Sequence, residues 1–165
     1  MQGGATETRS TYSGDTITFL FRLLRGHGIE PKALLLIQDA TMQRRPGAVV
    51  RHQEPQVRVV DYAAYRTRVV VRATTGRPAS PDSVLDSLIY ADEPNGMRDI
   101  DRYLTLLMGE IPRLTDAPGG YGLKGANLIA RVDIPENVTA AFDALKHEFP
   151  THIRTANPAF SQAKG

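Results

Sequence analysis

The chain has 165 residues, no cysteine and a formal net charge of +2. This length fits one domain, since domains most often have about 100–150 residues, and the hydrophobic content of 41% is that of a globular protein. The absence of cysteine excludes disulfides, thiolate zinc sites and iron–sulfur clusters.

The N-terminal region predicts an arm followed by a helix. Residues 1–13 are polar and glycine-rich, so we expect a flexible arm without a secretory signal. A helix is expected to begin near Ser13 or Asp15, because either side chain can cap exposed amides. Its buried face has the i, i+3, i+4, i+7 spacing and consists of Ile17, Leu20, Phe21 and Leu24.

The middle of the chain carries turn and strand patterns. The apolar run Ala33–Ile37 fits a buried strand or a helical turn, which leaves the fold of residues 31–43 open. Arg44–Gly47 predicts a turn because it contains Pro-Gly. Strands are expected at Ala48–Arg51, Val57–Val60 and Arg66–Thr74. In the last of these, Thr67, Val69 and Val71 are expected to face the core, and the arginines to face outward.

The second half reads mainly as helix. Ser80 caps a predicted helix that begins at Pro81 and buries Val84, Leu85, Leu88 and Ile89. After a break at Glu93–Gly96, a second helix spans 100–111 and Pro112 closes it. Residues 117–125 predict a flexible loop. The remaining expected elements are a strand at 127–134, a helix at 135–149 and a short edge strand at 151–155.

This element order predicts an α+β fold. Strands cluster instead of alternating with helices, so we expect a largely antiparallel sheet flanked by amphipathic helices. The expected organisation is a flexible arm at 1–13, a single domain at 14–155 and a flexible tail at 156–165.

No motif predicts catalysis. The four histidines have no metal-ligand spacing, and Asp99 and Asp101 point in divergent directions at i and i+2 of a helix. The loop Gly119–Gly125 lacks the Gly-Lys-Ser/Thr of a phosphate-binding loop. We therefore predict a protein that is not an enzyme, with no catalytic residue, no metal site and no cofactor.

Charge is unevenly distributed along the chain. Residues 44–77 contain eight arginines and two acids, whereas residues 78–116 contain eight acids and three arginines. These segments either neutralise each other within one molecule or join copies head to tail. The candidate assembly contacts are Arg66, Arg68, Arg72, Asp82, Asp86, Asp99 and Asp101.

An alternative partner is nucleic acid. Sixteen arginines against four lysines favour phosphate contacts, and an arginine-rich strand face near Tyr62 and Tyr65 suits single strands. The longest apolar run is far shorter than the roughly 20 residues that cross a bilayer, so we expect no membrane partner.

One family resemblance rests on the basic strand region. An amphipathic N-terminal helix, then Arg45-Pro46-Gly47-Ala48-Val49-Val50-Arg51, then Tyr65–Ala73, then helices and a late strand, resembles tail terminator and neck proteins of tailed bacteriophages. The resemblance covers residues 15–134. It implies a structural virion protein that forms a hexameric ring at the head–tail junction and contacts tail tube and neck proteins. It also implies assembly in the host cytoplasm and then residence in the virion.

Which ring of the particle this would be stays open. The chain has two predicted helices after the main strand where the family has one, and a further helix and tail after Ile134. The nucleic-acid alternative also stays open at this point, because the same arginine face serves both functions.

Overall fold

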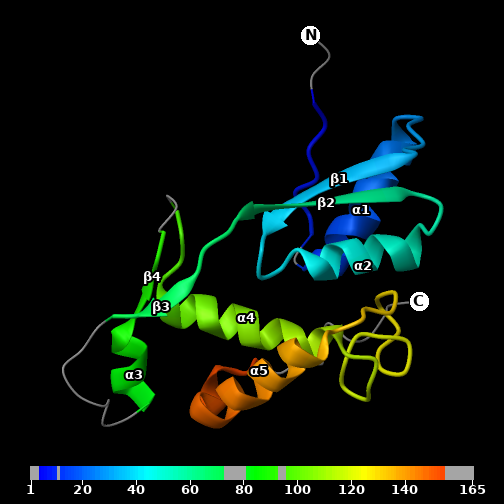
Figure 1. Cartoon of the computed structure of the whole chain (residues 1–165). Coiled ribbons are helices and arrows are strands. Elements are labelled where there is room, and N and C mark those ends of the chain that lie inside the picture. The colour runs from blue at the N-terminus through cyan, green and yellow to red at the C-terminus, as the bar shows by residue number, and fades with distance from the viewer. Residues whose placement is uncertain (1–3, 11, 73–80, 93–95, 155–165) are drawn as a thin grey trace.

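Helices and two small sheets make up the part of the chain that the computed structural model describes, which is residues 4–10, 12–72, 81–92 and 96–154 (Figure 1). The first half contains α1 (Ser13–Gly26), β1 (Ala33–Asp39), α2 (Arg44–Gln53) and β2 (Arg58–Tyr65). The second half contains β3 (Val69–Val71), α3 (Pro81–Ser87), β4 (Leu88–Tyr90), α4 (Ile100–Leu114), α5 (Glu136–Glu148) and the 3₁₀ turn η1 (Pro150–His152).

The two longer strands form a parallel pair. β1 runs beside β2 from Ala33↔Arg58 to Ile37↔Tyr62, with an irregularity near Asp39. A parallel pair requires a crossover connection, and α2 provides it. The α+β class is confirmed, but the expectation of a largely antiparallel sheet is wrong, because among the described residues only the three-residue strands β3 and β4 pair in antiparallel fashion.

The segment that was expected to be a turn and a strand is helix α2. It begins at Arg44, so Pro46 and Gly47 lie in the first turn. Proline is tolerated there because the first amides of a helix have no intrahelical partner. Ala48, Val49 and Val50 are buried in succession, so this stretch of α2 is covered around most of its circumference. The Pro-Gly pair therefore starts a helix, and the crossover makes the neighbouring strands parallel.

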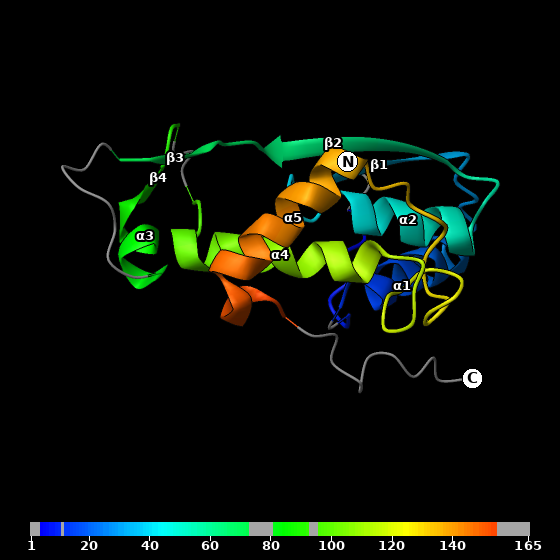
Figure 2. The same cartoon turned by 60° about the horizontal axis from the view of Figure 1, so that its bottom comes forward.

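Both N-terminal helices cover the same face of the β1–β2 sheet (Figure 2). Val50 and Phe21 are 0% and 2% exposed, and they centre the larger core. Leu34, Leu36 and Val59 pack against this core from the sheet. The expected apolar face of α1 is confirmed, with Ile17 and Phe21 buried and Leu20 and Leu24 half-buried.

A second core lies along α4. Leu104 and Met108 pack with Phe149 at the end of α5, while Leu114 at the other end of α4 belongs to the larger core. Helix α4 therefore joins both cores into a single domain. Its cap is Asp99, whose carboxylate accepts a bond of 2.7 Å from the Arg102 amide. Pro112 lies inside the helix, two residues before its end.

Three other expectations need correction. Residues 127–134 form no strand: they lie against the helices, with Ile129 buried and Ala130 N–H donating to the Ala48 carbonyl at 3.0 Å. Leu88 and Ile89 belong to β4 and not to a helix, because α3 ends at Ser87. Residues 150–152 form a 3₁₀ turn in place of the edge strand that was expected to start at Thr151.

Some expectations lie outside the described residues. They are the cap at Ser80, most of the break at 93–96, the end of the strand at 73–74 and the tail at 156–165. Of the N-terminal arm, residues 4–10 are described. They form neither helix nor strand, and Arg9 lies over the Phe19 ring of α1 at 5.5 Å.

Candidate assembly surface

One face of the β1–β2 sheet is apolar, and no element of the described residues covers it. Leu35, Ile37, Val60 and Tyr62 are 59%, 57%, 43% and 58% exposed. The register places Leu35 beside Val60 and Ile37 beside Tyr62, so the four side chains form one continuous surface. We call this surface the bare face. Parallel sheets in proteins are almost always covered on both faces, so the exposure of the bare face is unusual for a parallel sheet.

The sequence of β1 produces this surface directly. Side chains of a strand alternate between faces, so Leu34 and Leu36 turn toward the helices while Leu35 and Ile37 turn away. The run is apolar at every position instead of every second one. Such a run is typical of a strand that is buried on both sides.

The sheet also has strand edges to which no further strand is bound in the described residues. In the described part of the chain, β1 pairs only with β2 and β3 pairs only with β4. An edge strand presents amide and carbonyl groups that can bind a strand of another molecule. Edge and face together make this sheet suited to contact another chain.

A cluster of polar side chains connects α2 to β2 on the covered side of the sheet. Asp61 of β2 accepts a bond from Gln43 Nε2 at 3.0 Å and pairs with Arg51 at 2.6 Å. Gly47 leaves the space for it, because a Cβ there would lie 2.7 Å from Asp61 Oδ1. Gln43 is buried, and its Oε1 has no hydrogen-bond partner among the described residues. The cluster holds α2 against β2. Because Asp61 points to the covered side, the cluster does not lie on the bare face.

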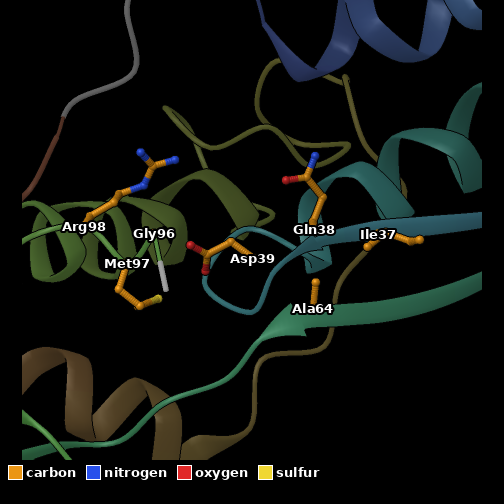
Figure 3. A pocket seen from close by; sticks show the side chains of 7 residues that line it. All are labelled: Ile37, Gln38, Asp39, Ala64, Gly96, Met97 and Arg98. Carbon is orange, nitrogen blue, oxygen red and sulfur yellow. The ribbon is translucent and has the colours of Figure 1, made fainter. Parts of the chain in front are cut away.

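A hollow of about 310 Å³ lies at the carboxyl end of the strands (Figure 3). Asp39 lies in it, and its Oδ1 accepts bonds from the Thr41 amide and hydroxyl at 2.8 Å each. The hollow borders the bare face because Ile37 belongs to both. Its lining residues are Ile37, Gln38, Asp39, Ala64, Gly96, Met97 and Arg98.

Two tyrosines lie next to Arg98, which lines this hollow. The Tyr90 hydroxyl donates to the Arg98 carbonyl at 2.7 Å, and the Tyr90 and Tyr103 rings pack edge to face at 5.4 Å. Burial raises the pKa of the Tyr103 hydroxyl, and the charge of Asp39 raises it further. Arg98 is therefore held against β4, which packs on α4.

A second hollow, of about 300 Å³, lies along the outer edge of β1. Ser10 and Tyr12 of the N-terminal segment form one wall, and Ile17 and Leu20 of α1 form another. Burial raises the pKa of the Tyr12 hydroxyl, and the hydrogen bond between Tyr12 and Asp15 raises this pKa further. This edge of the sheet is thus partly enclosed, whereas the bare face is open.

The predicted arginine strand is shorter than expected and has no core face. Val69, Val70 and Val71 are all exposed, Val71 to 64%. Arg68 and Arg72 flank them, and Arg66 lies in the link from β2. All three arginines are exposed, and none has an ion pair with an acid of the described residues.

Helix α3 and the start of α4, to which the four candidate acids belong or lie next, are at the same end of the molecule as β3 (Figure 1). Asp82 and Asp86 belong to α3, and Asp86 is exposed. Asp99 caps α4, and Asp101 lies 2.7 Å from Nε2 of His152. Asp99 and Asp101 therefore have partners within the chain. The structure does not separate the arginines and the acids onto opposite sides.

Sequence reasoning missed the best-buried ion pair. Arg45 of α2 and Glu110 of α4 lie 2.9 Å apart, with side chains 12% and 6% exposed. Arg113 donates to the Gly109 carbonyl in the same region, and burial together with this arginine lowers the pKa of Arg154. Arg45 and Glu110 come from distant segments of the chain, so no local sequence pattern predicts their pairing. They lock the first half of the chain onto α4.

Other kinds of site find no support in the described residues. In that part of the chain, no three His, Asp or Glu side chains are placed to hold a metal ion. None of its helices combines the length and the apolar character that a membrane crossing requires. No family model matches the sequence.

Proposed function

We propose that the chain is a structural subunit that assembles with copies of itself into a ring. The observation that carries the proposal is the bare face, four exposed apolar side chains on a parallel sheet. Monomeric soluble proteins rarely expose contiguous apolar patches of large area, and larger ones mark interaction sites. A second protein surface that covers this face would bury it.

The placement in a particle rests on the sequence. The resemblance to tail terminator and neck proteins supports a structural virion protein at the head–tail junction of a tailed phage-like particle. Such a protein would contact tail tube and neck proteins and assemble in the host cytoplasm. Residues 45–51, which are part of the pattern that carries the resemblance, belong to helix α2. The proposed ring therefore rests on the bare face, and the proposed location rests on the resemblance.

Native mass spectrometry with negative-stain electron microscopy tests the ring. We expect the purified chain to give one closed oligomer whose population rises with protein concentration, and ring-shaped particles in the images. A solitary molecule at every concentration, with no rings, would contradict the proposal.

A second candidate function is nucleic-acid binding. Arg66, Arg68 and Arg72 are exposed without acidic partners in the described residues, and such side chains suit phosphate contacts. Filter binding of single-stranded DNA and RNA at two salt concentrations separates the candidates. Tight binding with a steep salt dependence favours nucleic acid, and negligible binding favours protein assembly.

A further inference from the structure

We infer that a group of arginines where α2, α4 and the end of η1 meet is a binding site for a phosphate group. Its members are Arg45 of α2, Arg102 and Arg113 of α4, and Arg154, which follows η1. We call this set the arginine cluster. The inference goes beyond the proposed ring and does not depend on it, because none of these arginines belongs to the bare face.

The sequence of α4 places two of these arginines on one side of the helix. Arg102 and Arg113 are eleven positions apart, which is about three helical turns. Gly109 lies on the same side, seven positions after Arg102 and four before Arg113. The last described part of the chain packs on α4 through η1 (Figure 2). Arg154 is therefore brought to the side of α4 that already carries two arginines.

Gly109 allows the arginines to come together. A Cβ at this position would lie 2.7 Å from Nη1 of Arg113 and 3.3 Å from Cβ of Arg154. Arg113 also donates a hydrogen bond to the Gly109 carbonyl. Glycine inside a helix is destabilising relative to alanine. The space that it leaves here is taken by two cationic residues from different segments of the chain.

Positive charge exceeds negative charge in the cluster. Glu110 supplies a carboxylate, and its Oε2 lies 2.9 Å from Nε of Arg45. Partial burial lowers the pKa of Arg154, and the charges of Arg113, Arg102 and Arg45 lower it further. Glu110 acts in the opposite direction, but one carboxylate does not neutralise a set of guanidinium groups that all stay protonated. A bound anion would relieve the repulsion among them.

The acids at the start of α4 are engaged elsewhere. The Asp99 carboxylate accepts a bond from the Arg102 amide, and Asp101 lies 2.7 Å from Nε2 of His152. In the described part of the chain, neither Arg102 nor Arg154 forms an ion pair with an acid. Both arginines are exposed, so a ligand in solution can reach them.

The arrangement favours a phosphate group over a carboxylate. Guanidinium groups bind oxyanions through paired N–H donors, and these ones approach from three different segments of the chain. A tetrahedral phosphate presents oxygens in several directions, whereas a carboxylate presents two in one plane. Arg113, which is 9% exposed, would form the buried side of the site, and Arg102 and Arg154 its exposed side. Free phosphate and the backbone of a nucleic acid share this chemistry.

Isothermal titration calorimetry with inorganic phosphate, in a chloride buffer of constant ionic strength, tests the site. The first variant is Arg154→Gln, which removes one exposed guanidinium group. The matched control is Arg58→Gln, because Arg58 is an exposed arginine of β2 that is not among the charges acting on Arg154. The second variant, Gly109→Ala, keeps every charge and fills the space beside Arg113 and Arg154. Circular dichroism checks that each variant is folded.

We expect the wild type and Arg58→Gln to bind one phosphate per chain with equal affinity. Arg154→Gln and Gly109→Ala should bind it about tenfold more weakly, because each disturbs charge-assisted hydrogen bonds. Absence of phosphate binding by the wild type, or equal binding by folded Arg154→Gln, would overturn the inference.

A titration with a single-stranded oligonucleotide identifies the source of the phosphate. Tighter binding of the oligonucleotide than of inorganic phosphate, weakened in Arg154→Gln, would support the site and assign it to a nucleic-acid backbone. Phosphate binding without such a gain would support the site and assign it to a free anion. The ring is measured by oligomeric mass, so a failed titration would overturn the phosphate site and leave the ring proposal standing.

Discussion

The two faces of the β1–β2 sheet have the same kind of side chains and opposite surroundings. Leu34, Leu36 and Val59 pack against the core that α1 and α2 form, whereas Leu35, Ile37 and Val60 are exposed. Neighbouring residues of one strand thus differ only in which way they point. The comparison teaches that the covered face holds the fold together, and it leaves the exposed residues of the bare face free for the assembly that we propose. Substitutions on the covered face should therefore change the free energy of unfolding, whereas substitutions on the bare face should change the oligomeric state.

The largest expected effect lies under the covered face. Phe21→Ala removes a ring that is 2% exposed in the larger core, which leaves a cavity between α1 and the sheet. We expect a loss of about 3–5 kcal/mol in the free energy of unfolding. Urea unfolding followed by circular dichroism measures it. A loss much smaller than this would mean that the covered face is not the stable centre of the fold.

A similar loss is expected where the first half joins α4. Glu110→Ala leaves the Arg45 guanidinium buried without its carboxylate, beside Arg113 and Arg154. Breaking a buried pair costs about 3–5 kcal/mol in stability. The double variant Arg45→Met with Glu110→Leu should recover most of that loss, because it leaves no buried charge from the pair. Failure to recover would show that the pair does more than neutralise Arg45.

A moderate loss is expected at the clamp between α2 and β2. Gly47→Ala would normally favour a helix, but the new Cβ would lie 2.7 Å from Asp61 Oδ1 and displace the pair with Arg51. We expect a net loss of about 1 kcal/mol in unfolding free energy. The matched control is Gly26→Ala in α1, which meets open space. A stabilised Gly47→Ala variant would contradict the clamp.

Alkaline pH should weaken the fold through Tyr103. Its pKa is raised by burial, so the unfolded chain loses this proton first as pH rises above about 10. Stability is unaffected below that pH and falls as pH rises toward the folded-state pKa. Tyr103→Phe should flatten this fall and leave stability at neutral pH nearly unchanged, since the ring contact with Tyr90 remains. Urea unfolding at pH 8 and above pH 10 measures the difference. An unchanged alkaline slope would contradict it.

The smallest effect on folding is expected on the bare face. Ile37→Thr keeps a β-branched side chain at an exposed position, so unfolding free energy should change by no more than about 0.5 kcal/mol. Leu36→Thr, one residue earlier, places a hydroxyl against the core and should cost more. Equal losses in urea unfolding would break the comparison between the two faces.

The local elements of the fold could largely be predicted from the sequence. Helices α1, α4 and α5 have apolar residues at helical spacing, and their predicted ranges agree with the structure to within a few residues. Helix α2 could not be recognised, because Pro46-Gly47 is also a turn signal and its valines also suit a strand. The sheet topology could therefore not be predicted either, because the parallel pairing of β1 and β2 depends on α2 as the crossover.

The candidate surface was only partly visible in the sequence. The unbroken apolar run Ala33–Ile37 was the available signal, because alternate residues of a strand point to opposite faces. What the run could not show is that helices cover one face alone. The hollow combines Asp39 with Arg98, and the buried pair combines Arg45 with Glu110. Such pairs come from tertiary packing, which local spacing does not record.

The account depends most directly on the oligomeric mass of Ile37→Thr beside the wild-type chain. Native mass spectrometry at matched concentrations should show a closed oligomer for the wild type, and a shift to single chains for Ile37→Thr although its folding is intact. Leu123→Thr, in the distant loop, should behave as the wild type. Identical oligomers for the wild type and Ile37→Thr, or single chains for both at every concentration, would contradict the claim that the bare face is where copies meet.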